Sequence, residues 1–329
     1  SVKRAHDLLI KLPVRDVVLW TALITGYIDY GYANEAFLCF EQMENEGISC
    51  DVLTLVSILK ACVILGSITR GQEIHATVVN KGLEREPLIG NSLLDMYAKC
   101  GSLIATQYVF SMLIDRNVVS WTALIDGYVE NGCCPKALDC FEKMHYDGSL
   151  ANVVTFMCIL KACTNIRAES RGQEIHIVIV KRGFTGDNVV ANGLVNMYAK
   201  CGMFLEAQNV FEKLLVPTVA ACNALMGGYS EHGHAKEALH CFEWMQYEGM
   251  VMNAITFVCI LKACGDLGTS TKGLEVHDEI TKKGMETEAH MGSALSDMYA
   301  KCGLLGDAQV LFDQLQEIDV VSWTALITG

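Results

Sequence analysis

The sequence predicts an all-α protein, an α-solenoid of stacked helix-turn-helix repeats. Two observations lead to this fold class: a long internal repeat, and a helical spacing of apolar residues within it. The segment VVLWTALI at 17–24 returns as VVSWTALI at 118–125 and at 320–327, with a weaker copy, VAACNALM, at 219–226, so successive copies lie 101 residues apart. Repeats that each hold a few helices and cannot bury their apolar faces alone are typical of solenoids.

Each unit of 101 residues divides into sub-units of 35, 35 and 31 residues, and each sub-unit holds two apolar helix patterns. Leu23, Ile24 and Tyr27 illustrate the spacing of three and four residues that one face of a helix requires. Gly31, with Gly132 and Gly233 at the same place in later units, separates the two patterns, where a positive φ favours glycine. Each sub-unit is therefore expected to be a helical hairpin.

Composition excludes some classes of protein. The chain has 329 residues, of which 51% are hydrophobic, so a sizeable core is expected and disorder is not. No apolar run reaches the ~20 residues of a membrane-spanning helix, so no membrane partner is expected. The 15 cysteines recur within apolar helix patterns, which favours reduced, packed thiols. The net charge of −13 argues against nucleic-acid binding by bulk electrostatics alone.

The motifs WTALI…GY…EAL..F..M, ILKAC…G..IH and N.L.DMYAKCG…A..VF resemble the P, L and S repeats of plant PLS-class pentatricopeptide repeat (PPR) proteins, and the resemblance covers the whole chain. It implies a right-handed superhelix of the predicted hairpins. It places P repeats at 17–51, 118–152 and 219–253, L repeats at 52–86, 153–187 and 254–288, and S repeats at 87–117, 188–218 and 289–319. A partial S repeat at 1–16 and a partial P repeat at 320–329 lead us to expect an excised stretch of a longer protein.

By this resemblance, each repeat reads one nucleotide of single-stranded RNA through the fifth residue of its first helix and its own last residue. Short polar side chains at such positions suit the Watson–Crick edge of an unstacked base. The expected base-reading pairs of the P and S repeats are Thr21 with Asp51, Asn91 with Asn117, Thr122 with Asn152, Asn192 with Thr218, Asn223 with Asn253, and Ser293 with Asp319. The resemblance implies guanine for the first and last pairs, adenine for the third, cytosine for the second and fifth, and a pyrimidine for Asn192 with Thr218. The same residue types also suit helix caps and ordinary turns, and this alternative stays open.

Three further groups of residues complete the expected RNA-binding face. The L repeats hold aliphatic fifth residues, which have no hydrogen bond with which to choose a base, so we expect spacers or weak readers there. These pairs are Val56 with Glu86, Met157 with Asp187, and Val258 with Glu288. By the resemblance, aliphatic second residues, including Val18, Val119 and Val189, pack against base faces, and Lys99, Lys200 and Lys301 contact phosphate.

The resemblance implies that the chain is the recognition array of an RNA-editing (C-to-U) or processing factor in a mitochondrion or chloroplast. It also implies an editing deaminase or accessory protein, acting in trans, as a second partner. No enzyme activity or cofactor is expected from the chain itself. His277 and Glu279 spell the H-x-E of a zinc deaminase, but no C-x-x-C accompanies them, and the equivalent histidines His75 and His176 lack the glutamate. The alternative is a helical-repeat scaffold that binds a protein or peptide, which the acidic charge would suit.

Overall fold

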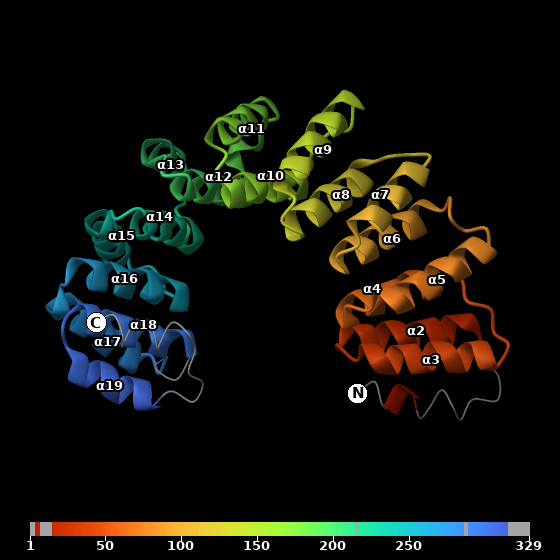
Figure 1. The fold of residues 1–329 in the computed structure, drawn as a ribbon, viewed down its shortest axis with the longest axis horizontal. Coiled ribbons are helices and arrows are strands. Elements are labelled where there is room, and N and C mark those ends of the chain that lie inside the picture. The colour runs from red at the N-terminus through yellow and green to blue at the C-terminus, as the bar shows by residue number, and fades with distance from the viewer. Residues whose placement is uncertain (1–3, 7–14, 215, 286–288, 315–329) are drawn as a thin grey trace. The chain divides into compact units, whose positions relative to one another are not determined.

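A computed structural model describes residues 4–6, 15–214, 216–285 and 289–314, and helices with short connections make up these segments (Figure 1). The chain divides into two compact units, Ser1–Ala162 and Cys163–Gly329. In the described part of the chain, no helix combines the length and apolar character needed to cross a membrane.

The first unit is a series of antiparallel helical hairpins. Their helices are α2 (Val17–Asp29) with α3 (Ala33–Asn45), α4 (Val52–Leu65) with α5 (Ile68–Asn80), α6 (Pro87–Lys99) with α7 (Leu103–Met112), and α8 (Val118–Glu130) with α9 (Cys134–Tyr146). The helix α10 (Val153–Ile166) then continues across the boundary into the second unit.

The second unit repeats this arrangement. Its helices are α11 (Glu169–Lys181), the short 3-10 helix η1 (Phe184–Gly186), α12 (Asn188–Lys200) with α13 (Phe204–Phe211), α14 (Val219–Glu231) with α15 (Ala235–Tyr247), α16 (Ala254–Leu267) with α17 (Ser270–Lys282), and α18 (Ala289–Lys301) with α19 (Leu305–Gln314).

The local sequence explains where these helices begin and turn. Asp51 and Asn253 accept hydrogen bonds from the backbone N–H groups of Thr54 and Thr256, forming capping boxes at the starts of α4 and α16. Gly31 lies between α2 and α3 with a φ of +78°, and its counterparts Gly132 and Gly233 have similar values. The expected positive φ in these turns is therefore confirmed.

First helices of neighbouring hairpins pack side by side within each unit. In the first unit, α4 lies between α2 and α6, and α6 packs on α8; in the second, α16 lies between α14 and α18, and α14 packs on α12 (Figure 1). The predicted α-solenoid of stacked hairpins is confirmed. Within each unit, the first helices form one continuous layer.

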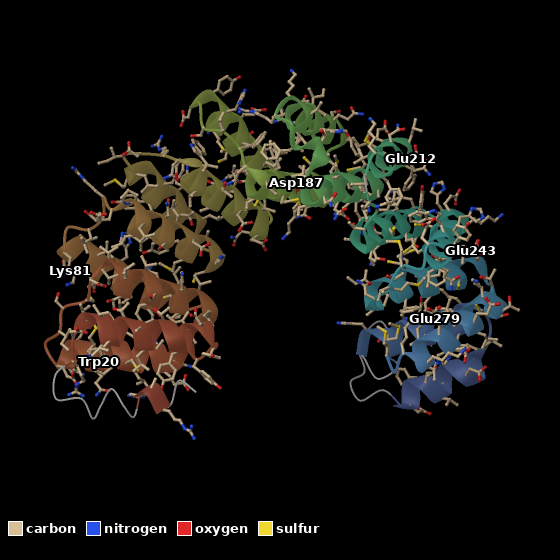
Figure 2. The ribbon with its side chains drawn as sticks, turned by 180° about the vertical axis from the view of Figure 1, so that it is seen from behind. Trp20, Lys81, Asp187, Glu212, Glu243 and Glu279 are labelled. Atoms are coloured by element: carbon tan, nitrogen blue, oxygen red, sulfur yellow. The ribbon has the colours of Figure 1, made fainter. Side chains whose placement is uncertain are left out.

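The core lies between these helices. Trp20 is fully buried on α2 (Figure 2), and Phe242 and Phe257 are fully buried where α15 meets α16. The recurrent cysteines Cys62, Cys163 and Cys264 are completely buried. Burial raises the pKa of Cys62 to about 12, so its thiol stays protonated at neutral pH. These cysteines fill space between helices, as expected from their repetition.

Candidate nucleic-acid interface

The predicted base-reading residues that the structure describes lie near the N-terminal ends of the first helices. Each fifth residue lies in the second turn of its own helix and, within the described residues, the last residue of the same repeat directly precedes the next first helix. Because neighbouring first helices pack side by side, residues about 30 positions apart in the chain come together. The backbone geometry of the hairpin therefore places the two residues of a pair at one junction.

Two pairs are joined directly by a hydrogen bond. Asn223 on α14 donates from Nδ2 to Oδ1 of Asn253 at 3.0 Å. Thr218 donates from Oγ1 to Oδ1 of Asn192 on α12 at 2.9 Å. Both members of each pair thus lie within reach of one small polar ligand.

Two more pairs are joined through a third side chain. Thr21 Oγ1 lies 2.7 Å from the hydroxyl oxygen of Thr54, which in turn donates to Asp51 Oδ1 at 2.7 Å. Thr122 and Asn152 repeat this arrangement through Thr155, at 2.7 and 2.9 Å. The sequence did not predict these bridging threonines, although a hydroxyl recurs at the third position of α4, α10 and α16 within otherwise apolar segments.

The remaining pairs are placed differently. Asn91 is half-buried on α6, while Asn117 uses its Oδ1 to accept from the backbone N–H groups of Val119 and Ser120. Ser293 is buried on α18, and its predicted partner Asp319 lies outside the described residues. Among the described residues, no hydrogen bond thus joins Asn91 to Asn117.

The fifth residues expected to be spacers or weak readers are buried or half-buried. Val56 is buried, and Met157 and Val258 are half-buried. Glu86 is exposed, Asp187 is half-buried and caps α12, and Glu288 lies outside the described residues.

Aliphatic side chains at the second position of the first helices face solvent. Their exposed fractions range from 49% for Leu88 to 67% for Val18. The same position holds exposed Leu53, Val119, Val154, Val189 and Ile255. Each lies three residues before the fifth position, almost one helical turn away, so an apolar surface adjoins the polar pair. Such a site offers hydrogen bonds to the edge of a planar ring and an apolar contact to its face.

The lysines expected to contact phosphate are all held in ion pairs. Lys99 lies 2.8 Å from Asp95 on the same helix. Lys200 pairs with Glu231 on the neighbouring first helix, α14. Lys301 contacts both Asp297, at 2.9 Å, and Asp266 on α16, at 3.1 Å. An incoming phosphate would have to compete with these carboxylates.

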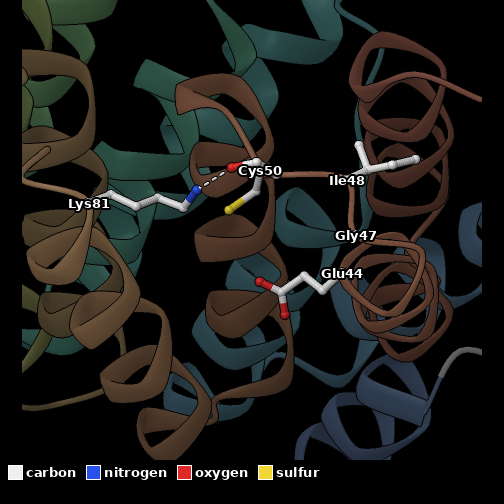
Figure 3. Close-up of a pocket in the computed structure, with 6 residues that line it drawn as sticks. Glu44, Gly47, Ile48, Cys50 and Lys81 are labelled. Atoms are coloured by element: carbon white, nitrogen blue, oxygen red, sulfur yellow. Dashed lines mark hydrogen bonds between the residues drawn. The ribbon is translucent and has the colours of Figure 1, made fainter.

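A cavity of about 240 Å³ lies elsewhere, between the turn that follows α3 and the end of α5. Lys81 donates there to the hydroxyl of Ser49 at 2.6 Å, beside the buried thiol of Cys50 (Figure 3). Its lining includes none of the predicted base-reading residues. Among the residues that the structure describes, no cluster of His, Cys, Asp or Glu could hold a metal ion.

Comparison with known proteins identifies the family. A model described as the PPR repeat family matches residues 15–63, 116–165 and 217–266, and a second PPR repeat model matches 189–216 and 293–320. Together these segments make up more than half of the chain. The chain belongs to the pentatricopeptide repeat family.

Relatives of this PPR chain come from Arabidopsis thaliana. It is 37% identical over its full length to the chloroplastic pentatricopeptide repeat-containing protein DOT4, of which it covers 38%. It is 34% identical over its full length to the mitochondrial pentatricopeptide repeat-containing protein At2g03380, of which it covers 48%. The chain therefore spans less than half the length of either relative.

Solved structures share its fold. The PPR protein PPR10 of maize, crystallised with an 18-nt psaJ RNA element, superposes with a TM-score of 0.77 at 19% identity, over 99% of this chain and 48% of that one. Yeast Rmd9p in complex with a 16-nt target RNA gives a TM-score of 0.51 at 14% identity, over 95% of this chain and 68% of that one. At these identities the likeness supports the fold.

Proposed function

We propose that this PPR chain binds single-stranded RNA with base selectivity, one nucleotide per hairpin, through the paired fifth and last residues of its P and S repeats. The observation that carries the proposal is the junction at which a short polar pair, such as Asn192 with Thr218, lies almost one turn from an exposed aliphatic residue, here Val189. Asn192 and Thr218 are half-buried and Val189 is exposed, so neither feature is part of the fully buried core. Together they match what recognition of an unstacked base requires, namely hydrogen bonds to its edge and packing on its face.

The division into P, L and S repeats belongs to this proposal. Within a triplet, the P and S repeats read bases, while the L repeats act as spacers or weak readers because their fifth residues are aliphatic. Read along the chain, the expected footprint from 5′ to 3′ is G, any, C, A, any, pyrimidine, C, any, G.

The cellular role that we propose is the recognition array of an organellar C-to-U editing or processing factor. Relatives named mitochondrial and chloroplastic support an organellar location. An editing deaminase or accessory protein would then act in trans or from another part of a longer chain. Base contacts would supply selectivity, and the few lysines, already paired with carboxylates, would supply modest, salt-sensitive affinity.

A fluorescence-anisotropy titration tests the RNA-binding proposal. The ligands are an RNA with the expected footprint, an RNA of permuted sequence and a DNA of the expected sequence, each measured at two salt concentrations. We expect the footprint RNA to bind at least about tenfold more tightly than the permuted RNA, a difference of ~1.4 kcal/mol. The Thr122→Asn variant should shift the preference at its position from A toward C. Equal binding of all three ligands would refute the base assignment and favour a protein ligand.

A further inference from the structure

Three threonines at the third position of the L repeats form the starting observation. Thr54 on α4, Thr155 on α10 and Thr256 on α16 are fully buried. A buried hydroxyl needs hydrogen-bond partners, because leaving it unpaired costs about 1–3 kcal/mol. In all three cases the partners are the two predicted base-reading residues of the preceding P repeat.

The contact between helices separates this arrangement from an ordinary helix cap. The two bonds of the capping box run from the Thr54 backbone N–H to Asp51 Oδ1, at 2.8 Å, and from the Asp51 backbone N–H to the Thr54 hydroxyl oxygen, at 3.4 Å. Asp51 Oδ1 also accepts from the Thr54 hydroxyl, at 2.7 Å. The additional 2.7 Å bond from Thr54 to Thr21 runs from α4 to α2, across 33 residues of sequence. A cap does not need this bond, but it fixes the side chain of the fifth residue.

Thr155 and Thr256 bridge the two residues of their pairs as Thr54 does. Thr155 lies 2.7 Å from Thr122 and donates to Asn152 at 2.9 Å. The hydroxyl of Thr256 lies 2.9 Å from Asn223 Oδ1 and 3.0 Å from Asn253 Oδ1. The bridge therefore accompanies threonine and asparagine alike at the fifth position.

The bridge also fixes the direction of the hydrogen bonds. A hydroxyl has one proton, and a carboxylate only accepts. The hydroxyl of Thr54 donates its proton to the Asp51 carboxylate in a charge-assisted hydrogen bond. The oxygen of Thr54 must therefore accept from the hydroxyl of Thr21. Thr21 donates its only hydroxyl proton to Thr54, so it can offer a ligand only the lone pairs of its oxygen. The same reasoning applies to Thr122, because Asn152 Oδ1 already faces the N–H and hydroxyl of Thr155.

This polarity determines which base edge fits. Thr21 and Asp51 both offer acceptors, so they suit two adjacent donors. Guanine alone has such a pair on its Watson–Crick edge, at N1–H and N2–H₂; adenine and cytosine place a ring-nitrogen acceptor next to the amino group, and uracil flanks one N–H with two carbonyls. At the second P repeat, Asn152 offers the amide donor Nδ2 in place of a second acceptor. Thr122 and Asn152 therefore do not match the two adjacent donors of guanine.

We propose that Thr54, Thr155 and Thr256 are positioning residues for base selection by the preceding P repeat. This inference rests on the proposed RNA-binding function and deepens it. It gives the L repeats a part in recognition through their third residue, despite their aliphatic fifth residues. Thr54 holds Thr21 as an acceptor and thereby sets the preference of the first P repeat for guanine.

The test compares Thr54→Val, which removes the hydroxyl at nearly constant shape, with Thr54→Ser, which keeps it. Each protein is titrated by fluorescence anisotropy with the footprint RNA and with an RNA in which the first G is replaced by A. A third RNA changes the A read by Thr122 and Asn152 to G, and serves as an internal control. Thermal unfolding of both variants monitors the lost capping contact.

We expect the wild-type protein to prefer G over A at the first position by about tenfold. Thr54→Val should reduce this preference to about threefold or less, because Thr21 can then turn its proton outward, whereas Thr54→Ser should retain it. The preference at the control position should be unchanged in both. A wild-type preference in Thr54→Val, or an equal loss at both positions, would overturn the positioning role. A wild-type protein that does not distinguish footprint from permuted RNA would instead overturn the proposed function, and the inference with it.

Discussion

His75 Nδ1 lies 2.9 Å from the hydroxyl oxygen of Tyr97 and ties the second helix of one hairpin to the first helix of the next. The contact recurs along the described hairpins, always with a tyrosine at the same position of a first helix. The pairs are His6 with Tyr27, His75 with Tyr97, Gln107 with Tyr128, His176 with Tyr198, Gln208 with Tyr229, and His277 with Tyr299. The three repeated histidines are thus packing residues, and Gln107 and Gln208 make the equivalent contact with Tyr128 and Tyr229.

These histidines make the fold sensitive to acid. Burial lowers the pKa of His75 and His176 below the ordinary value of 6.5, so the folded protein holds both rings neutral. The unfolded chain binds protons more readily as the pH falls through 6.5. Their contribution to stability is therefore complete above pH 6.5 and is lost as the pH falls toward the folded pKa.

The His75→Gln, His176→Gln double variant should therefore lose less stability in acid than the wild-type protein. Glutamine already bonds the equivalent tyrosines at Tyr128 and Tyr229 but does not titrate. Melting temperatures measured by circular dichroism at pH 7.5 and pH 5.5 would check this. An equal drop in both proteins would show that other groups control the acid response.

Adjacent glycines on α14 should respond oppositely to alanine. A Cβ at Gly228 would lie 2.6 Å from Ala199 Cβ and 2.7 Å from the Ala199 carbonyl oxygen, so α12 and α14 would have to separate. We expect Gly228→Ala to destabilise the protein by about 1–3 kcal/mol. A Cβ at Gly227 would have only Cys259 Sγ nearby, at 3.9 Å, so Gly227→Ala should stabilise the helix by about 0.5–1 kcal/mol. Urea unfolding of both variants measures the two changes in the free energy of unfolding. Changes of the same sign would contradict this prediction.

Releasing a lysine from its ion pair should strengthen RNA binding. Glu231 pairs with Lys200 between α14 and α12, so Glu231→Gln frees a cation in the layer of first helices. We expect tighter binding and, if Lys200 then neutralises one more phosphate, a salt dependence steeper by about 0.7 in the logarithmic slope.

The control for this prediction is Glu275→Gln, which removes the same charge from an exposed pair with Lys272 on the second helix α17. Anisotropy titrations across a salt series compare the two variants. An equal gain in both would mean that net charge, and not the release of Lys200, governs affinity.

Loss of an exposed aliphatic residue should weaken RNA binding without affecting the fold. Val119 is 53% exposed at the second position of α8, so Val119→Ser removes little buried surface and should leave the melting temperature nearly unchanged. Binding of the footprint RNA should weaken several-fold, by about 1 kcal/mol, if this side chain packs on a base. Ile104→Ser, on the second helix α7, is the matched control and should bind normally. Equal affinities of the two variants would contradict the packing role.

The sequence predicts the hairpins well because the signals that form them are local. Val17, Val52 and Pro87 begin first helices, and the turn glycines follow at fixed distances. The apolar periodicity of each helix is visible within one or two turns. Stacking of neighbouring hairpins then follows from the need to cover those apolar faces.

The connections within the site were less predictable because their partners lie about 30 residues apart. Thr54 is an ordinary first-turn residue in sequence, and only the packing of α4 on α2 reveals its bond to Thr21. Likewise, Lys200 and Glu231 occupy the same position in neighbouring repeats, but their pairing depends on side-chain conformations that the repeat pattern does not specify.

In the proposed function, most of the described last residues of the repeats serve both as partners in base reading and as helix caps. Asp51, Asn117, Asn152, Asp187, Thr218 and Asn253 all accept a backbone hydrogen bond at the start of the following helix. Replacing such a cap with a residue that cannot accept costs about 0.5–2 kcal/mol. Retargeting this array at the last residues is therefore restricted to short side chains that accept hydrogen bonds. Changing several of these residues to types that cannot cap a helix would lower the melting temperature of the protein.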